Sequence, residues 1–153
     1  MEIKIIDLYA HRDQRGHLIE LFREDVLASH GFKLPRMGYI SWTHPGVLRG
    51  PHEHMHQTDV FVFVEGQWKL TLLDNNRFSD GFGEVLSYEF GKLKPAIVVI
   101  PPKIIHGYRN IGKEMSFVLN FPDKLYAGWN KKYPVDEVRY EENKEILKYY
   151  ATD

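Results

Sequence analysis

The stretch VLRGPHEHMHQTDVFVFVEG, residues 47–66, contains the two patterns that decide the fold and the chemistry of this chain. It places His52, His54 and His56 close together, and then runs into the apolar segment DVFVFV. His52 and His54 are two positions apart, so on an extended strand both rings project from the same face. We therefore expect a strand with two imidazoles on one face, a turn around residues 55–58, and a new strand from Asp59.

Other short runs along the chain also have strand patterns. QWKLTLLD (67–74) alternates, with Trp68, Leu70 and Leu72 on one face, as a half-buried strand should. DVFVFV and AIVVI (96–100) are apolar on both faces, which suits the middle of a sandwich or barrel. The remaining strand candidates are HLIELF (17–22), GYISW (38–42) and SFVLNF (116–121).

Helical patterns are rare in the chain. Only REDVLASH (23–30) and EENKEILKYY (141–150) look helical, and turn residues join the other segments. No repeat or linker divides the 153 residues, which are enough to bury a core. We therefore expect one domain, residues 1–153, with an all-β fold, a sandwich or small barrel, and short helices near each end.

The composition excludes several classes of protein. A formal net charge of −1 gives no case for binding nucleic acid or an anionic membrane surface. The absence of cysteine excludes disulfides, thiolate ligands and a cysteine nucleophile. No apolar run approaches membrane-spanning length, and the first residues, MEIKIIDLYAHRD, lack a signal-peptide core. A cytoplasmic location is the resulting expectation.

The histidine cluster has two chemical interpretations. His106, in PPKIIHGYRN just after another apolar strand, can join His52, His54 and Asp59 around one point. Such a set of nitrogen and oxygen ligands suits Mn, Fe, Ni, Cu or Zn. Alternatively, histidines with a near-neutral pKa serve as general acids and bases. Burial of a carboxylate at the start of VFVFV would require a partner for Asp59.

The spacing of Gly46, His52, His54, Asp59 and Gly66 resembles the first motif of the cupin superfamily, with Asp in place of the usual Glu. The segment 101–110 resembles its second motif, although Lys103 replaces the usual Gly. The resemblance implies a cupin jelly-roll barrel, which agrees with the strand pattern.

A closer resemblance covers most of the chain. DQRGHLIELF, SWTHPGVLRGPH, IPPKIIHGY and LYAGWNKKYP are similar to the dTDP-4-dehydrorhamnose 3,5-epimerase family, whose members are cupins that work without a metal. The resemblance implies a homodimer acting on a nucleotide-sugar with a 4-keto-6-deoxy ring, and it suggests roles for individual residues. These are Arg15 and Glu20 as substrate contacts, often made across the dimer, Arg49 as the diphosphate ligand, His52 as the catalytic base, His106 beside the sugar, and Tyr126 as an aromatic of the sugar site.

The chain departs from the family pattern at two positions that matter for its chemistry. The family's active-site Lys falls on Asp59, and its acidic Tyr falls on Asn120. His54 is an added histidine, and an Asp that orients the base has no clear counterpart. An Asp beside a nascent enolate would repel it, whereas beside a cation it would neutralise the charge.

These departures leave three alternatives to the family's own mechanism. A metal held by His52, His54, Asp59 and His106 can replace the Lys in a metal-dependent enzyme. His52 and His54 can form a metal-free acid and base pair, as in sugar 3,4-ketoisomerases, which share an R-G-x-H-x-H stretch. The chain can also be a sugar-nucleotide binding protein that has lost the chemistry.

Several of these residues also have plain structural interpretations. Arg49 can pair with a carboxylate at a strand end, Arg15 and Glu20 can form a surface pair, and Tyr126 can be a packing residue. We expect His56 to be solvated, because the turn begins there. The remaining histidines show no ligand spacing and are expected on the surface or in loops: His11, His17, His30 and His44.

Overall fold

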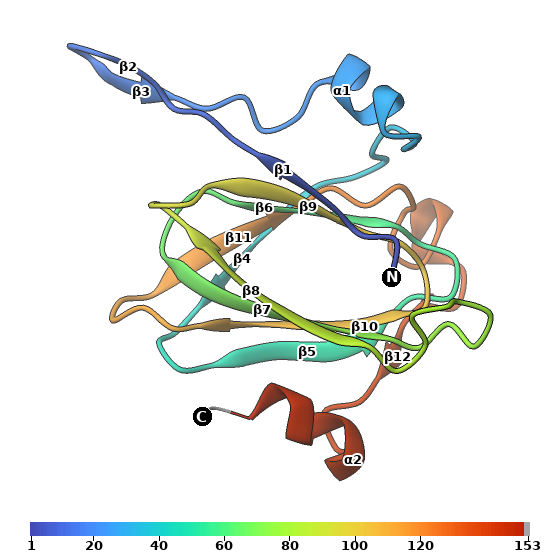
Figure 1. Ribbon diagram of the computed structural model, residues 1–153. Coiled ribbons are helices and arrows are strands. Elements are labelled where there is room, and N and C mark those ends of the chain that lie inside the picture. Colours follow the sequence, from blue (N-terminus) through green and yellow to red (C-terminus); the bar gives the residue numbers. More distant parts are fainter. Residues whose placement is uncertain (152–153) are drawn as a thin grey trace.

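The computed structural model describes residues 1–151 and consists mainly of two antiparallel sheets that face each other (Figure 1). One sheet has the order β1-β9-β6-β11-β4, and the other has the order β12-β5-β10-β7-β8. Strands β2 and β3 form a separate hairpin that projects from the barrel (Figure 1). The strands of the first sheet are β1 (Lys4–Asp7), β4 (Tyr39–Thr43), β6 (Asp59–Phe63), β9 (Ala96–Ile100) and β11 (Ser116–Asn120). Those of the second are β5 (Leu48–Glu53), β7 (Gln67–Asp74), β8 (Val85–Gly91), β10 (Ile104–Asn110) and β12 (Val138–Arg139).

The remaining elements are short and lie outside the two sheets. Figure 1 places α1 over the first sheet and α2 beneath the second. Within the described residues, no helix is long and apolar enough to cross a membrane. The bounds are β2 (His11–Asp13), β3 (Gly16–Leu18), α1 (Glu24–Ser29), η1 (Trp129–Lys131), α2 (Lys144–Leu147) and η2 (Lys148–Tyr150). The expected all-β class and the two short helical regions are therefore confirmed.

The main core lies between the sheets and explains the alternating pattern of the sequence. Trp68, Leu70 and Leu72 all face this core and are fully buried. Phe61 and Phe63 enter it from β6, whereas Val60 and Val62 point outward. Side chains of the N-terminal region cover that outer face, including Phe22 and Phe32. Strands β6 and β9 are apolar on both faces because both faces are covered, as expected.

One expectation about strand position needs correction. HLIELF was expected to be a strand over residues 17–22, but only residues 16–18 form one, β3, and it is exposed. Residues 21 and 22 pack onto the first sheet as an irregular segment, so their apolar character reflects docking and not pairing. Strands β8 and β10 were not predicted from the sequence, because they mix polar and apolar side chains.

Candidate active site between the sheets

β5 carries His52 but ends at Glu53, so His54 lies just past the strand and not on it as expected. β5 also contains a bulge that decides which side chains enter the barrel. β5 pairs with β10 so that Arg49 lies opposite Tyr108 and His52 lies opposite His106, with a register shift between them. Residues three apart on a regular strand point to opposite faces, but the extra residue of a bulge brings both to one face. Gly50 makes the bulge possible, because its φ is +84° and a Cβ there would lie 2.7 Å from the carbonyl oxygen of His106.

Three histidines and one aspartate converge at this place. The ring of His52 lies 4.5 Å from that of His106 and 5.4 Å from that of His54, centroid to centroid. Asp59 enters from β6 in the opposite sheet and is 1% exposed. One carboxylate oxygen, Oδ2, lies 3.2 Å from His54 Nε2 and 3.3 Å from His106 Nε2. The structure therefore brings together the four residues that sequence analysis grouped.

Amides hold the other oxygen of the Asp59 carboxylate. Oδ1 accepts hydrogen bonds from Gln57 Nε2 at 2.9 Å and from Asn120 Nδ2 at 2.8 Å. Although burial alone would raise the pKa of Asp59, the facing imidazoles of His106 and His54 hold that pKa well below its usual range. Asp59 is thus a buried carboxylate whose charge is matched by imidazoles, as its expected burial required.

The imidazoles of His54 and His106 are both oriented by backbone carbonyls. His54 Nδ1 donates to the carbonyl of Asp136, and His106 Nδ1 donates to the carbonyl of Ile104 at 2.9 Å. Both rings therefore present Nε2 to the same oxygen of Asp59. Burial opposes protonation of His54, but Asp59 outweighs it and raises the pKa of His54 above its usual value. The carboxylate of Asp59 thus favours the imidazolium form of His54.

His52 has the opposite electrostatic character. Its side chain is 15% exposed, and burial, together with the neighbouring His106 and His54, lowers the pKa of His52 to about 2. It is therefore a neutral imidazole across the physiological range. Glu137 Oε1 lies 3.9 Å from His52 Nδ1, on the segment just before β12. At this distance the carboxylate makes no hydrogen bond to the ring, but its negative charge favours the protonated form of His52.

Sequence analysis missed Glu137, Gln57, Asp136 and Tyr39. Glu137 and Asp136 are about eighty residues from the histidines in sequence, and no spacing pattern marks them. Tyr39 shares its strand with Ser41, and the alternation in GYISW would place both on one face. The hydroxyl of Tyr39 accepts a hydrogen bond from Asn120 Nδ2 at 2.9 Å.

The donor set also matches the requirements of a divalent cation. One ligand atom from each of His52, His54, Asp59 and His106 lies within 4.8 Å of the others. Within residues 1–151, Asp59 Oδ2 and His106 Nε2 are buried and make no hydrogen bond. Histidine ligands commonly donate Nδ1–H to a carbonyl, as two of these do. The residues therefore fit a metal of the kind that sequence analysis named.

The other residues expected at the site lie at different distances from this cluster. Arg49 reaches β4, where its Nε donates to Thr43 Oγ1 and another nitrogen donates to the carbonyl of Trp42. Tyr126 lies in a groove of about 920 Å³ that also contacts His54. Arg15 sits on the projecting hairpin and pairs with Asp13, and Glu20 lies 3.5 Å from Arg23. Neither Arg15 nor Glu20 contacts the cluster within the described chain.

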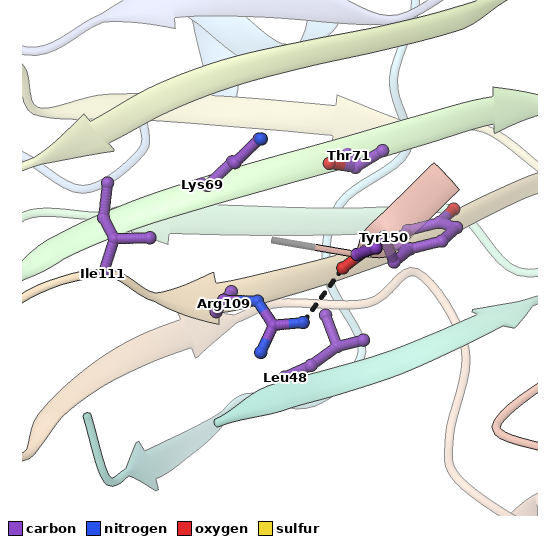
Figure 2. A pocket seen from close by; sticks show the side chains of 7 residues that line it. Leu48, Lys69, Thr71, Arg109, Ile111 and Tyr150 are labelled. Atoms are coloured by element: carbon purple, nitrogen blue, oxygen red, sulfur yellow. Dashed lines mark hydrogen bonds between the residues drawn. The ribbon is translucent and has the colours of Figure 1, made fainter. Parts of the chain in front are cut away.

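The expected positions of the remaining histidines are confirmed. His56 is exposed in the turn after β5. The histidines elsewhere in the chain are also exposed: His11, His17, His30 and His44. A second hollow, of about 180 Å³, lies on the outer face of the second sheet against the C-terminal segment (Figure 2). There Arg109 donates to the carbonyl of Tyr150, and the hollow shares no residue with the cluster.

Comparison with known proteins gives a consistent result. The family model of dTDP-4-dehydrorhamnose 3,5-epimerase matches residues 1–135. The curated "Probable low-salt glycan biosynthesis epimerase Agl13" of Haloferax volcanii is 35% identical over 127 residues, which are 82% of this chain and 80% of that protein. The spore coat polysaccharide biosynthesis protein SpsL of Bacillus subtilis is 32% identical over 126 residues, which cover 81% and 80% of the two chains.

A solved structure supports the fold. The dTDP-6-deoxy-D-glucose-3,5-epimerase RmlC of Legionella pneumophila, solved with dTDP-4-keto-L-rhamnose, superposes with a TM-score of 0.80. The two chains are 21% identical, and the match covers 95% of this chain and 76% of that one. The likeness confirms the expected cupin jelly roll.

Proposed function

The chain belongs to the dTDP-4-dehydrorhamnose 3,5-epimerase family, and from this premise we propose that it epimerises a nucleotide-linked 4-keto-6-deoxy sugar in glycan biosynthesis. One observation carries the proposal: a neutral histidine, His52, lies 3.9 Å from Glu137 and stands beside His54, whose imidazolium form Asp59 favours. A free base next to a fixed positive charge is the arrangement that removal of a proton beside a ketone requires. The family match favours this assignment over a metal-dependent enzyme of another class or a binding protein without turnover.

His52 is the general base in this mechanism. It takes the proton from the carbon beside the ketone, and the electrons of the broken C–H bond move to the ketone oxygen as an enolate. Only the neutral ring of His52 can accept this proton, and Glu137 stabilises the imidazolium that results. General bases of this kind contribute about 10²- to 10⁴-fold to the rate.

The positive charge beside the enolate comes from histidine in place of the family's Lys. His54 carries a raised pKa and is held in place by Asp59 and by the carbonyl of Asp136, to which its Nδ1 donates. Sequence analysis anticipated that Asp59 would repel an enolate. In the structure two imidazoles and two amides surround its carboxylate, so Asp59 supports the neighbouring charge instead of facing the substrate.

Substrate binding falls to the residues around this centre. The guanidinium of Arg49 has five N–H groups, of which two are used by Thr43 and Trp42, so donors remain for a diphosphate. His106 stands beside His52 next to the sugar, and Tyr126 lines the adjoining groove.

We assign a cytoplasmic, homodimeric state, in which Arg15 and Glu20 on the exposed N-terminal arm contact the substrate of the partner. Sedimentation velocity tests the dimer, and a monomer at micromolar concentration would contradict it.

We assign no metal to this reaction, although His52, His54, Asp59 and His106 fit one. A divalent cation bound there would polarise the ketone oxygen in place of His54. Elemental analysis of protein purified without added metal separates the two cases. Stoichiometric Mn, Fe, Ni, Cu or Zn that is lost in Asp59→Asn would contradict the metal-free assignment.

The substrate assignment is tested by turnover. Incubation with dTDP- or UDP-4-keto-6-deoxyglucose, followed by ¹H NMR of the sugar ring, should give a product inverted at C3, C5 or both. Arg49→Ala should weaken binding by at least tenfold. Protein that binds neither nucleotide-sugar and inverts neither carbon would refute the proposal.

A further inference from the structure

Inversion of a carbon beside a ketone needs two groups on opposite sides of the ring. His52 removes the proton from one face, and a second acid must supply a proton to the other face, because return by His52 restores the original configuration. In this fold the two sides correspond to the two sheets. His52 and His106 stand on β5 and β10 in one sheet, and the facing wall is formed by β11 and β4 of the other.

The facing wall carries a cross-strand pair of polar residues at the level of the cluster. Asn120 on β11 is the register partner of Tyr39 on β4, so their side chains lie on the same face. Asn120 is fully buried, and its Nδ2 bonds both Asp59 Oδ1 and Tyr39 Oη. The side chain of Asn120 thus links the hydroxyl of Tyr39 to the carboxylate of Asp59.

The hydrogen bonds of Asn120 fix the direction in which Tyr39 can donate. Asn120 Oδ1 accepts from the backbone N–H of Val60 at 3.1 Å, so the amide cannot flip and Nδ2 must face the hydroxyl. Tyr39 Oη is therefore an acceptor toward Asn120, and its own proton is directed elsewhere. Within residues 1–151 no acceptor for that proton is found, and the side chain is 42% exposed.

Other tyrosines near the barrel lack these properties. Tyr108 Oη shares a hydrogen bond of 2.6 Å with Ser41, and the residue is 3% exposed within the core between the sheets. Tyr126 lies in the outer groove, where its described contacts include none with His52, Asp59 or His106. Tyr39 alone among these three combines a free O–H with a place on the wall facing His52.

From this geometry we infer that Tyr39 is the acid that protonates the enolate on the face opposite His52. The inference rests on the proposed epimerase function. In the first step, the C–H bond breaks and His52 becomes an imidazolium. In the second, the enolate carbon takes the proton of the Tyr39 hydroxyl, the ketone re-forms, and a tyrosinate remains. Solvent then removes one proton from His52 and returns one to Tyr39, so no proton is gained or lost overall.

The test separates proton removal from inversion. Wild-type protein, Tyr39→Phe and a control, Tyr149→Phe, are incubated in D₂O with dTDP-4-keto-6-deoxyglucose, and NMR follows deuterium incorporation and ring configuration. Tyr149 is a suitable control, because it is 41% exposed on the C-terminal helical segment. We expect Tyr39→Phe to incorporate deuterium with retention, while its inversion rate falls by 100-fold or more. The control should match wild type in both.

Each other outcome overturns the inference in a distinguishable way. Inversion by Tyr39→Phe at the wild-type rate would show that another group donates the proton. Loss of both exchange and inversion in this folded variant would assign Tyr39 to binding or proton removal. Absence of exchange in wild type would refute the epimerase function itself. If Tyr39→Phe does not fold, Tyr39→Gln keeps an acceptor for Asn120 and carries the same prediction.

Discussion

At the scale of single residues, the site is a set of titrating groups whose environments push their pKa values apart. His52 is buried among other histidines and stays neutral, whereas His54 is buried against Asp59 and favours its charged form. The residue types and their grouping could be predicted from the spacing in HEHMHQTD. Their protonation could not, because it depends on burial and on the close approach of His106 and Asp59, which only the folded barrel sets.

Burial of neutral His52 makes the stability of the protein depend on acidity. With a folded-state pKa of about 2 against 6.5 when unfolded, only the unfolded chain takes up this proton between those values. Stability should therefore fall as pH falls below 6.5, by about 1.4 kcal/mol per pH unit from this group. Urea denaturation at pH 7, 6 and 5 measures the slope. In His52→Gln the slope of unfolding free energy against pH should be smaller by about 1.4 kcal/mol per pH unit, the contribution of one proton. An unchanged slope would contradict the assignment.

Removal of the Asp59 charge should lower the free energy of unfolding, because the buried, protonated ring of His54 then has no carboxylate beside it. The raised pKa of His54 stabilises the fold below about pH 6.5, and that contribution is lost as pH rises through the folded-state pKa. Asp59→Asn should therefore cost about 3 kcal/mol of unfolding free energy near pH 6, and less at pH 9. Chemical denaturation at both values tests this, with exposed Asp80→Asn as the control. A cost independent of pH would point to packing alone.

At the scale of elements, the turn after β5 is closed by a segment far along the chain. The carboxylate of Asp136 accepts from the backbone N–H groups of Met55, His56 and Gln57 at 2.8–3.0 Å, and its carbonyl accepts from His54. Sequence analysis placed the turn correctly between the strands. It could not identify what closes the turn, because a capping carboxylate some eighty residues away leaves no local pattern.

Asp136→Ala should loosen both the turn and the active site. Loss of three charge-assisted hydrogen bonds at a partly solvated turn should lower the unfolding free energy by about 2 kcal/mol. Turnover should fall more than binding, because the segment whose backbone carbonyl orients His54 is no longer fixed to the turn by the Asp136 carboxylate. Asp123→Ala is the matched control, since within residues 1–151 the Asp123 carboxylate accepts a single hydrogen bond, from the N–H of Thr58. Equal losses of stability and turnover in the two variants would rule out a special role for Asp136.

At the scale of the whole molecule, the fold was more predictable than the site. The alternation in QWKLTLLD indicated a strand with one buried face, and the continuous apolar runs DVFVFV and AIVVI indicated strands buried on both faces. These patterns can be read locally, because the burial of each strand face determines which of its residues are apolar. HLIELF was misassigned because docking onto a sheet and pairing within one leave the same apolar pattern. The barrel gathers His52, Asp59 and Tyr39 from both sheets. The strand positions and the cupin-like motif anticipated that His52 and Asp59 would meet, but they did not anticipate Tyr39.

The core between the sheets should make unfolding cooperative. Phe63 is fully buried, with its ring 5.4 Å from Phe90 and 6.1 Å from Tyr108, centroid to centroid. Phe63→Ala should cost about 3–5 kcal/mol through the cavity that it leaves. Fluorescence and far-UV circular dichroism should report one coincident transition, as expected of a single domain over residues 1–153. Two separated transitions would contradict a single domain.

The most direct test of the account follows a single proton. Wild-type protein in D₂O should incorporate deuterium beside the ketone of dTDP-4-keto-6-deoxyglucose, as measured by mass spectrometry. His52→Asn should reduce the incorporation rate by 100-fold or more, whereas His56→Gln, a change at the exposed histidine of the same motif, should leave it unchanged. Undiminished exchange in a folded His52→Asn variant would show that another group removes the proton and would contradict the central claim.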